Sequence, residues 1–99
     1  MDIGREIRKA VETGRVVFGT DKTIQAVKTG DAKLVIVASN CPPETREALD
    51  YYVDLSGIHT YFYEGTGVEL GTACGKLFII SVIAVISPGE SNLLLVEGH

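Results

Sequence analysis

The sequence has few of the residues from which metal centres and cross-links are built. Among its 99 residues are two cysteines, Cys41 and Cys74, and two histidines, His59 and His99. Two cysteines without a regular Cys/His spacing provide neither a disulfide framework nor a zinc site. We therefore expect no metal and no cofactor, and we interpret each cysteine as a small buried or half-buried residue.

Long apolar runs are also missing. A membrane helix needs about 20 consecutive apolar residues, and every apolar run in this chain is shorter. Residues 1–6 are charged and do not resemble a signal peptide. We therefore expect a cytoplasmic protein that has no membrane partner. The chain length corresponds to one domain that spans residues 1–99.

Basic residues are in the minority. The chain has nine Lys and Arg against 13 Asp and Glu, which gives a formal net charge of −4. Because nucleic-acid binding relies on cations that neutralise phosphates, this balance argues mildly against a polyanionic partner, although a local patch can still bind RNA. Much of the excess negative charge comes from four acidic residues at three- and four-residue spacing along one predicted helix: Glu44, Glu47, Asp50 and Asp54. The simplest interpretation is that they form a solvent-exposed face of that helix.

A catalytic constellation is not visible either. Enzymes need a nucleophile–base pair or a convergent acid/base set, and His59 falls in a predicted strand. The chain contains no Walker loop and no strict dinucleotide fingerprint. Glu69 is a candidate base, but its position three residues after Thr66 is that of a capping box, which explains it without catalysis. We therefore expect a protein that is not an enzyme.

What the chain does contain is a regular alternation of helical and strand patterns. Ile3, Ile7 and Ala10 follow helical spacing, whereas residues 34–38 form an apolar run typical of a strand buried on both faces. This alternation predicts an α/β protein with a central sheet and helices on both faces. Helices are expected to end before Gly14, Gly30 and Gly57, and a fourth should run from Thr66 to about Cys74. Strands are expected at 16–18, 34–38, 58–63 and 77–86, followed by a short strand or extended tail at 92–96.

The most distinctive stretch is residues 64–76, Glu-Gly-Thr-Gly-Val-Glu-Leu-Gly-Thr-Ala-Cys-Gly-Lys. Glycine inside a helix costs about 1 kcal/mol relative to alanine, so its repeated use indicates a close backbone approach or a positive φ. Thr66 and Glu69 predict a capped helix N-terminus, which suits a phosphate. We expect Gly65, Thr66 and Gly67 to let a ligand approach the backbone.

Three loops run from a predicted strand end to a helix start, and they carry Lys22, Asn40 and Tyr63 among other polar groups. Ligands of open α/β sheets bind outside the carboxyl ends of the strands, so these loops share one edge if their strands are parallel and adjacent. The combination suits RNA with splayed bases. Phosphates would lie on helix ends and Lys22, base edges would meet Asp21 and Asn40, and a base would stack on Tyr63. On residue types alone, the interpretation that Asn40 and Thr20 are only caps is about equally supported.

Several strings together resemble a known family: Gly19-Thr20-x-Lys22-Thr23, the stretch from Ala32 to Pro42, and Glu69-Leu-Gly-Thr-Ala-Cys-Gly-Lys76. They are similar to the L-thirty-e family of archaeal and eukaryotic large-subunit ribosomal proteins, within the kink-turn RNA-binding superfamily. The resemblance covers nearly the whole chain. It implies a three-layer α-β-α sandwich with a mixed four-stranded central sheet. It also implies binding to a kink-turn or internal-loop motif of ribosomal RNA, neighbouring ribosomal proteins as further partners, and a monomer when free.

The resemblance also implies which residues meet RNA. They lie in the three strand-end loops and are Gly19, Thr20, Lys22, Thr23, Asn40, Tyr63, Gly65, Thr66 and Gly67. Asp21 departs from the family pattern, in which a basic residue or Asn is often present. A carboxylate beside phosphates is repulsive unless it accepts hydrogen bonds from a base. We therefore hypothesise that Asp21 reads a guanine edge.

Three alternatives stay open at this point. The chain could be a kink-turn reader of a modification or processing ribonucleoprotein. It could be a small α/β domain that binds a nucleotide or another anion, with or without catalysis. Finally, the acidic stripe on the third helix could make it a protein-interaction module.

Overall fold

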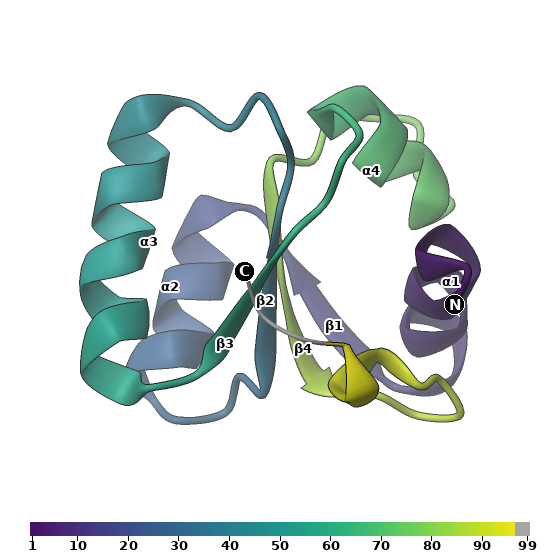
Figure 1. The fold of residues 1–99 in the computed structure, drawn as a ribbon, viewed down its shortest axis with the longest axis horizontal. Helices are drawn as coiled ribbons and strands as arrows, with labels where there is room; N and C mark the ends of the chain where they lie inside the picture. Colours follow the sequence, from purple (N-terminus) through teal and green to yellow (C-terminus); the bar gives the residue numbers. More distant parts are fainter. Residues whose placement is uncertain (97–99) are drawn as a thin grey trace.

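The computed structural model describes residues 1–96, in which helices and strands alternate along the chain (Figure 1). This order confirms the predicted α/β alternation. The helices are α1 (Ile3–Thr13), α2 (Thr20–Lys28), α3 (Pro43–Ser56) and α4 (Gly67–Ala73), the strands are β1 (Arg15–Phe18), β2 (Leu34–Val37), β3 (His59–Phe62) and β4 (Val82–Ser87), and a 3-10 helix, η1 (Leu93–Leu95), follows.

The four strands form one mixed sheet in the order β1-β4-β2-β3. Strand β4 is antiparallel to both β1 and β2, whereas β2 and β3 are parallel. The strands β1, β2 and β3 therefore run in the same direction, and their carboxyl ends share one edge of the sheet. The strands β1 and β2 are not adjacent, because β4 lies between them, but the shared direction is enough to bring their carboxyl ends to one edge.

Helices cover both faces of the sheet. In Figure 1, α2 and α3 lie on one side of the strands, and α1 and α4 lie on the other. Strand β2 shows why both faces are buried: Leu34 and Ile36 belong to the core under α1 and α4, while Val35 and Val37 belong to the core under α2 and α3. The three-layer sandwich with a mixed four-stranded sheet is thus confirmed.

The fourth strand is shorter than predicted. We expected a strand over residues 77–86, but β4 begins at Val82. Its neighbours β1 and β2 are four residues long, so the first half of the apolar run has no strand with which to pair. Residues 77–79 are exposed instead.

The predicted final strand is also wrong. Residues 93–95 form η1, in which Leu93 is buried in the core. The backbone N–H of Asn92 donates to Oε1 of Glu6 on α1 at 2.7 Å, so a side chain rather than a strand neighbour anchors this segment. His99 lies outside the described residues. Within residues 1–96, no helix has the length and apolar character needed to cross a membrane.

Candidate nucleic-acid interface

The three strand-end loops converge on the shared edge, together with a fourth segment, residues 77–81. Backbone hydrogen bonds join the four segments directly. The N–H of Gly19 donates to Val82, Ala38 to Ser81, Ser39 to Gly65 and Ile80 to Gly67, over distances of 2.8 to 3.0 Å. The predicted common edge is therefore present, and it includes a segment that was expected to be part of a strand.

The loop between β1 and α2 presents an open helix N-terminus. Gly19 is the N-cap, with a φ of 91° that favours glycine, and no side chain caps this end. Thr20, expected to be the cap, is the first helical residue instead. Asp21 and Lys22 are exposed in the first turn. Uncapped amides and the helix dipole give this end a positive potential that suits a phosphate.

Thr23 lies one turn further along α2, and its side chain points into the protein. It is fully buried, and its Oγ1 has no hydrogen-bond partner within the described residues. The side chain therefore supports the first turn of α2 from inside and offers no surface to a ligand.

Asn40 connects two of the loops. Its Oδ1 accepts a hydrogen bond from the N–H of Gly67 at 2.9 Å, so the loop after β2 is fixed to the start of α4. The side chain is otherwise exposed, and its amide nitrogen remains on the surface as a donor. Capping and ligand contact, which competed in the sequence analysis, are thus compatible: the oxygen serves the first and the nitrogen can serve the second.

The start of α4 forms the predicted capping box. Thr66 Oγ1 accepts from the N–H of Glu69, and Glu69 Oε1 accepts from the N–H of Thr66, both at 3.3 Å. Together with the bond from Gly67 to Asn40, three amides at this helix end donate to side chains. The Gly-rich stretch therefore does not form the open phosphate cradle that its composition suggested.

Gly67 is a glycine because of packing. It is buried, and a Cβ there would lie 2.8 Å from Cγ2 of Ile79 and 3.1 Å from the carbonyl oxygen of Ile80. Its missing side chain lets residues 79–80 cross closely over the start of α4. The glycine thus positions the fourth segment of the edge and does not expose backbone to a ligand.

Tyr63 follows β3 and is half-buried beside an acidic hollow of about 520 Å³, whose lining includes Asp2, Glu64 and Glu69. Burial and then the nearby Glu69 carboxylate raise the pKa of the Tyr63 phenol. Negative surroundings repel a phosphate but tolerate the neutral face of a base. The position is therefore compatible with base stacking and unfavourable for the RNA backbone.

Three large apolar residues at this edge were not among the predicted site residues. Leu77, Phe78 and Ile79 are 104%, 58% and 67% exposed. Phe78 and Ile79 line a hollow of about 250 Å³ together with Gly19 and Thr20. Exposed apolar side chains beside an open helix N-terminus suit the faces of unstacked bases. The available signal was the length of the largely apolar stretch 77–86, which exceeds the predicted strands of three to six residues beside it.

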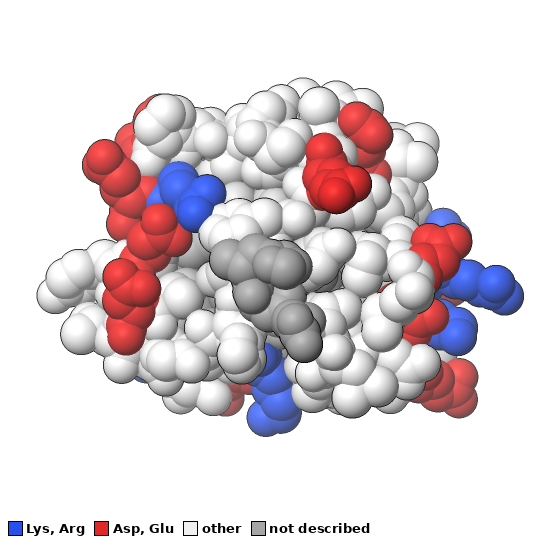
Figure 2. Space-filling model, in the orientation of Figure 1, with Lys and Arg blue, Asp and Glu red and all other residues white. Residues whose placement is uncertain are grey.

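The predicted acidic stripe lies on α3. Figure 2 shows acidic side chains gathered over α3, at the left of the view. Glu44, Glu47 and Asp54 are exposed, and Asp50 pairs with Arg46 at 3.2 Å. The predicted stripe is therefore present on α3 and is largely exposed to solvent.

The cysteines are not arranged for catalysis or metal binding. Burial raises the pKa of the Cys74 thiol to about 11, and it also raises the pKa of Cys41. Both side chains are therefore neutral thiols near pH 7 rather than nucleophilic thiolates. Residues 1–96 contain no group of three or more His, Cys, Asp or Glu side chains that could hold a metal ion.

Comparison with known proteins identifies close relatives over the full length. The chain is 48% identical over 98 residues to the large ribosomal subunit protein eL30 of Methanothermobacter thermautotrophicus, covering 99% of this chain and all of that protein. It is 49% identical to eL30 of Methanobrevibacter smithii, with 95% of each chain covered. It is 48% identical to eL30 of Methanococcus maripaludis, with 100% and 99% covered. These relatives are named as ribosomal proteins, in agreement with the prediction that the chain is not an enzyme.

A solved structure supports the fold independently. A protein of unknown function from Bacillus halodurans superposes with a TM-score of 0.83 at 24% identity, covering 95% of this chain and 93% of that one. A family model described as the ribosomal protein L7Ae/L30e/S12e/Gadd45 family matches residues 1–95. Because that match spans almost the entire chain and the archaeal relatives align end to end, the chain belongs to the ribosomal protein L7Ae/L30e/S12e/Gadd45 family.

Proposed function

We propose that the protein is a component of the large ribosomal subunit and binds a kink-turn or internal-loop motif of ribosomal RNA. The names of its full-length archaeal relatives support the first half of this proposal. The convergence of four loop segments on one edge of the sheet supports the second half, and it is the observation that carries the proposal.

The RNA backbone lies against the start of α2. One phosphate sits on the uncapped amides that follow Gly19, near Thr20, and Lys22 neutralises a phosphate beside it. This assignment rests on the missing side-chain cap and on the exposure of Lys22. The acidic hollow around Tyr63 makes the opposite end of the edge unsuitable for phosphates.

The bases are read by the remaining exposed groups. Asp21 accepts from a guanine edge, the amide nitrogen of Asn40 donates to a base, and an extruded base stacks on Tyr63. The apolar side chains of Phe78 and Ile79 cover a further base face, which suits their exposure. Four of the implied residues support the shape of the interface through packing and capping and do not contact RNA with their side chains: Thr23, Gly65, Thr66 and Gly67.

The guanine role of Asp21 is tested with Asp21→Ala. Loss of a base-specific hydrogen bond should weaken binding to the cognate RNA by about 1–3 kcal/mol and reduce the preference for guanine at one position. Tighter binding of the variant at all salt concentrations would mean that the carboxylate only repels phosphates.

Assembly into the ribosome is tested by sedimentation. A tagged copy of the protein expressed in an archaeal host should migrate with large subunits in a sucrose gradient. Its neighbours there would be ribosomal RNA and other ribosomal proteins in the cytoplasm, while the isolated chain runs as a monomer. Co-migration with a small modification or processing ribonucleoprotein would favour the other kink-turn readers of the superfamily.

A further inference from the structure

The solvent-exposed face of α3 carries a line of apolar side chains. Ala48, Tyr51 and Leu55 follow one another at spacings of three and four residues, which places them on one side of the helix. All three are exposed, Tyr51 to 62% and Leu55 to 71%. The opposite side of the helix is buried, since Leu49 and Val53 pack in the core beneath it. The helix is therefore apolar on two sides, and the apolar stripe formed by residues 48, 51 and 55 remains open to solvent.

Tyr51 is held in place by its neighbour. Its ring packs against Tyr52 in a T-shaped arrangement, with the ring centroids 5.1 Å apart and an interplanar angle of 86°. Tyr52 is itself half-buried and packs against the core between α3 and the sheet. An exposed aromatic side chain that is already ordered loses little entropy on binding, and tyrosine is common at protein interfaces for this reason.

Carboxylates accompany the apolar stripe. The two cations at the margins of this face are engaged within the protein: Arg46 pairs with Asp50 at 3.2 Å and lies over Phe62, and Lys28 of α2 lies over Tyr52. Even when both cations are counted, the four carboxylates of α3 leave the face with a net negative charge. Figure 2 shows these acidic side chains gathered over α3. Three of them are exposed and take part in no ion pair within residues 1–96: Glu44, Glu47 and Asp54.

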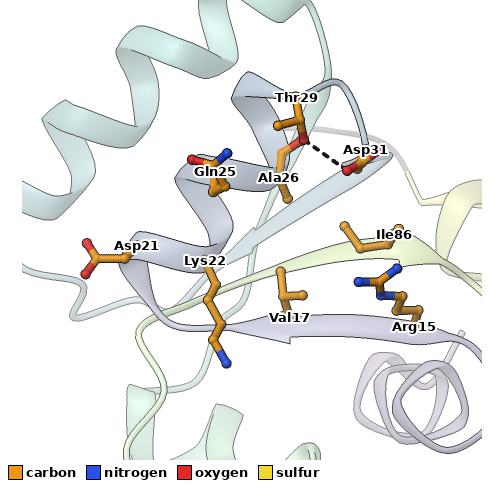
Figure 3. Close-up of a pocket in the computed structure, with 9 residues that line it drawn as sticks. All are labelled: Arg15, Val17, Asp21, Lys22, Gln25, Ala26, Thr29, Asp31 and Ile86. Carbon is orange, nitrogen blue, oxygen red and sulfur yellow. Dashed lines mark hydrogen bonds between the residues drawn. The ribbon is translucent and has the colours of Figure 1, made fainter.

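The groove between α2 and β1 lacks this combination. Its floor is apolar, but its lining contains two carboxylates, Asp21 and Asp31, and two cations, Arg15 and Lys22 (Figure 3). Because the opposite charges balance, that groove favours no ligand of either sign. The face of α3 differs from it, since its apolar stripe is accompanied by charge that is predominantly of one sign.

We propose that α3 binds a basic amphipathic helix of another protein. The apolar stripe has the three- and four-residue spacing that lets one helix pack along another, and Lys or Arg side chains of the partner would meet Glu47 and Asp54. A second copy of this chain does not fit, because a symmetric contact brings identical carboxylates together. RNA does not fit either, because its phosphates would meet the same carboxylates.

The identity of the partner is a separate step. Proteins that assemble on RNA carry Lys and Arg to neutralise phosphates, so a neighbouring protein of the large ribosomal subunit has the chemistry that this face requires. That identity rests on the proposed function, whereas the chemistry of the face does not.

Synthetic peptides test the chemistry of the face. The basic peptide is an amphipathic helix of about 14 residues, or two heptads, with Leu at the a and d positions and Lys or Arg elsewhere. Its control has the same composition in scrambled order. In NMR titrations of the isotope-labelled protein, the basic helix should shift the signals of Ala48, Tyr51 and Leu55 and bind about tenfold more tightly than the scrambled peptide. Equal binding of the two peptides would reduce the interaction to charge attraction and overturn the proposal. Shifts of the same signals with protein concentration alone would show self-association and overturn it as well.

Two variants in the last turn of α3 locate the contact. Leu55→Ala should weaken binding of the basic helix by about tenfold through lost apolar contact, and Asp54→Asn by about two- to fivefold through one lost exposed ion pair. The matched controls, Leu77→Ala and Glu90→Gln, remove an exposed apolar side chain and an exposed carboxylate elsewhere and should change nothing. Unchanged binding in both α3 variants overturns the proposal. The loop of the RNA edge precedes the first turn of α3, so both variants should bind kink-turn RNA like the wild type, and failure here leaves the proposed function intact.

Assembled subunits test the identity of the partner. A photoreactive benzoylphenylalanine in place of Leu55, in large subunits purified from an archaeal host, should cross-link to one protein at a helical segment rich in Lys and Arg. The same residue in place of Phe78 should cross-link to ribosomal RNA and serves as the control. A cross-link from position 55 to RNA alone, or none where position 78 reacts, would overturn the proposal. Absence of the protein from the subunits would contradict the proposed function instead, and the peptide titrations would then decide the proposal.

Discussion

Asn40 and Gly67 are 27 residues apart in the sequence, yet Oδ1 of Asn40 lies 2.9 Å from the backbone nitrogen of Gly67. This hydrogen bond fixes the loop after β2 to the start of α4. The adjacent bond from Ser39 N–H to the Gly65 carbonyl, at 3.0 Å, holds the same two loops a second time. Two loops of the proposed RNA-binding edge are therefore fixed relative to each other before any ligand binds. This reduces the loss of conformational entropy that RNA binding must offset.

Two substitutions at Asn40 separate its structural role from its role in binding. Asn40→Ala leaves the part-buried Gly67 amide without an acceptor, so it should lower the free energy of unfolding by about 1 kcal/mol and weaken RNA binding. Asn40→Asp keeps an acceptor oxygen and should retain wild-type stability, but it removes the amide donor and adds a negative charge, so RNA binding should still fall. Urea unfolding and RNA titration measure the two effects. Equal stability of Asn40→Ala and the wild type would show that this bond does not hold the loops.

Lys22→Ala tests whether this lysine contacts a phosphate. Each neutralised phosphate releases counterions, so the variant should bind kink-turn RNA more weakly and with a slope of log K against log salt that is shallower by about one unit. Lys33→Ala is the matched control, since Lys33 is exposed at the opposite edge of the sheet. An unchanged slope in the Lys22 variant would remove this residue from the phosphate contacts.

Phe78→Ala tests the fourth segment of the edge, residues 77–81, which the sequence did not predict to be part of the site. Base stacking on an aromatic ring contributes about 1–3 kcal/mol, so RNA affinity should fall by about 5- to 150-fold. Stability should change by less than about 0.5 kcal/mol, because the side chain is largely exposed. Leu55→Ala on α3 removes a comparably exposed apolar side chain away from the edge and serves as the control. Equal RNA affinity of the two variants would exclude Phe78 from the interface.

Cys74 makes stability depend on alkaline pH. Burial raises the pKa of its thiol from 9.0 to about 11 in the folded protein, so its contribution to stability is complete below pH 9 and disappears as the pH rises through 11. Over this range the wild type should lose of the order of 2 kcal/mol more than Cys74→Ala. Urea unfolding at several pH values under reducing conditions measures the difference, and Cys41→Ala controls for the removal of a less buried thiol. Parallel pH profiles of the wild type and Cys74→Ala would contradict the raised pKa.

Local patterns were sufficient to predict most of the individual elements. The uninterrupted run at residues 34–38 predicted a strand buried on both faces, and each of its side chains is buried, although β2 itself ends at Val37. Thr66 and Glu69 predicted the capping box that starts α4. Both signals depend on residues close together in the chain, and neither requires knowledge of the tertiary fold.

Relationships between elements were harder to predict. The position of β4 between β1 and β2 depends on how three distant strands pair, and the apolar run that contains β4 does not reveal where pairing stops. The exposure of Phe78 and Ile79 follows from that missing partner. The bond between Asn40 and Gly67 is equally non-local, since residue types alone fitted a local cap as well as a ligand contact. The candidate site was therefore predicted in its three loops and missed in its fourth segment.

The central claim is that this edge of the sheet recognises a bent, irregular RNA rather than nucleic acid in general. The most direct test is a titration of the protein with a kink-turn RNA and with a straight duplex of the same length, at one salt concentration near the physiological value. The account predicts that the kink-turn binds more tightly by about 10³-fold or more, the lower end of the range for specific over non-specific recognition. Equal affinity for the two RNAs would contradict it.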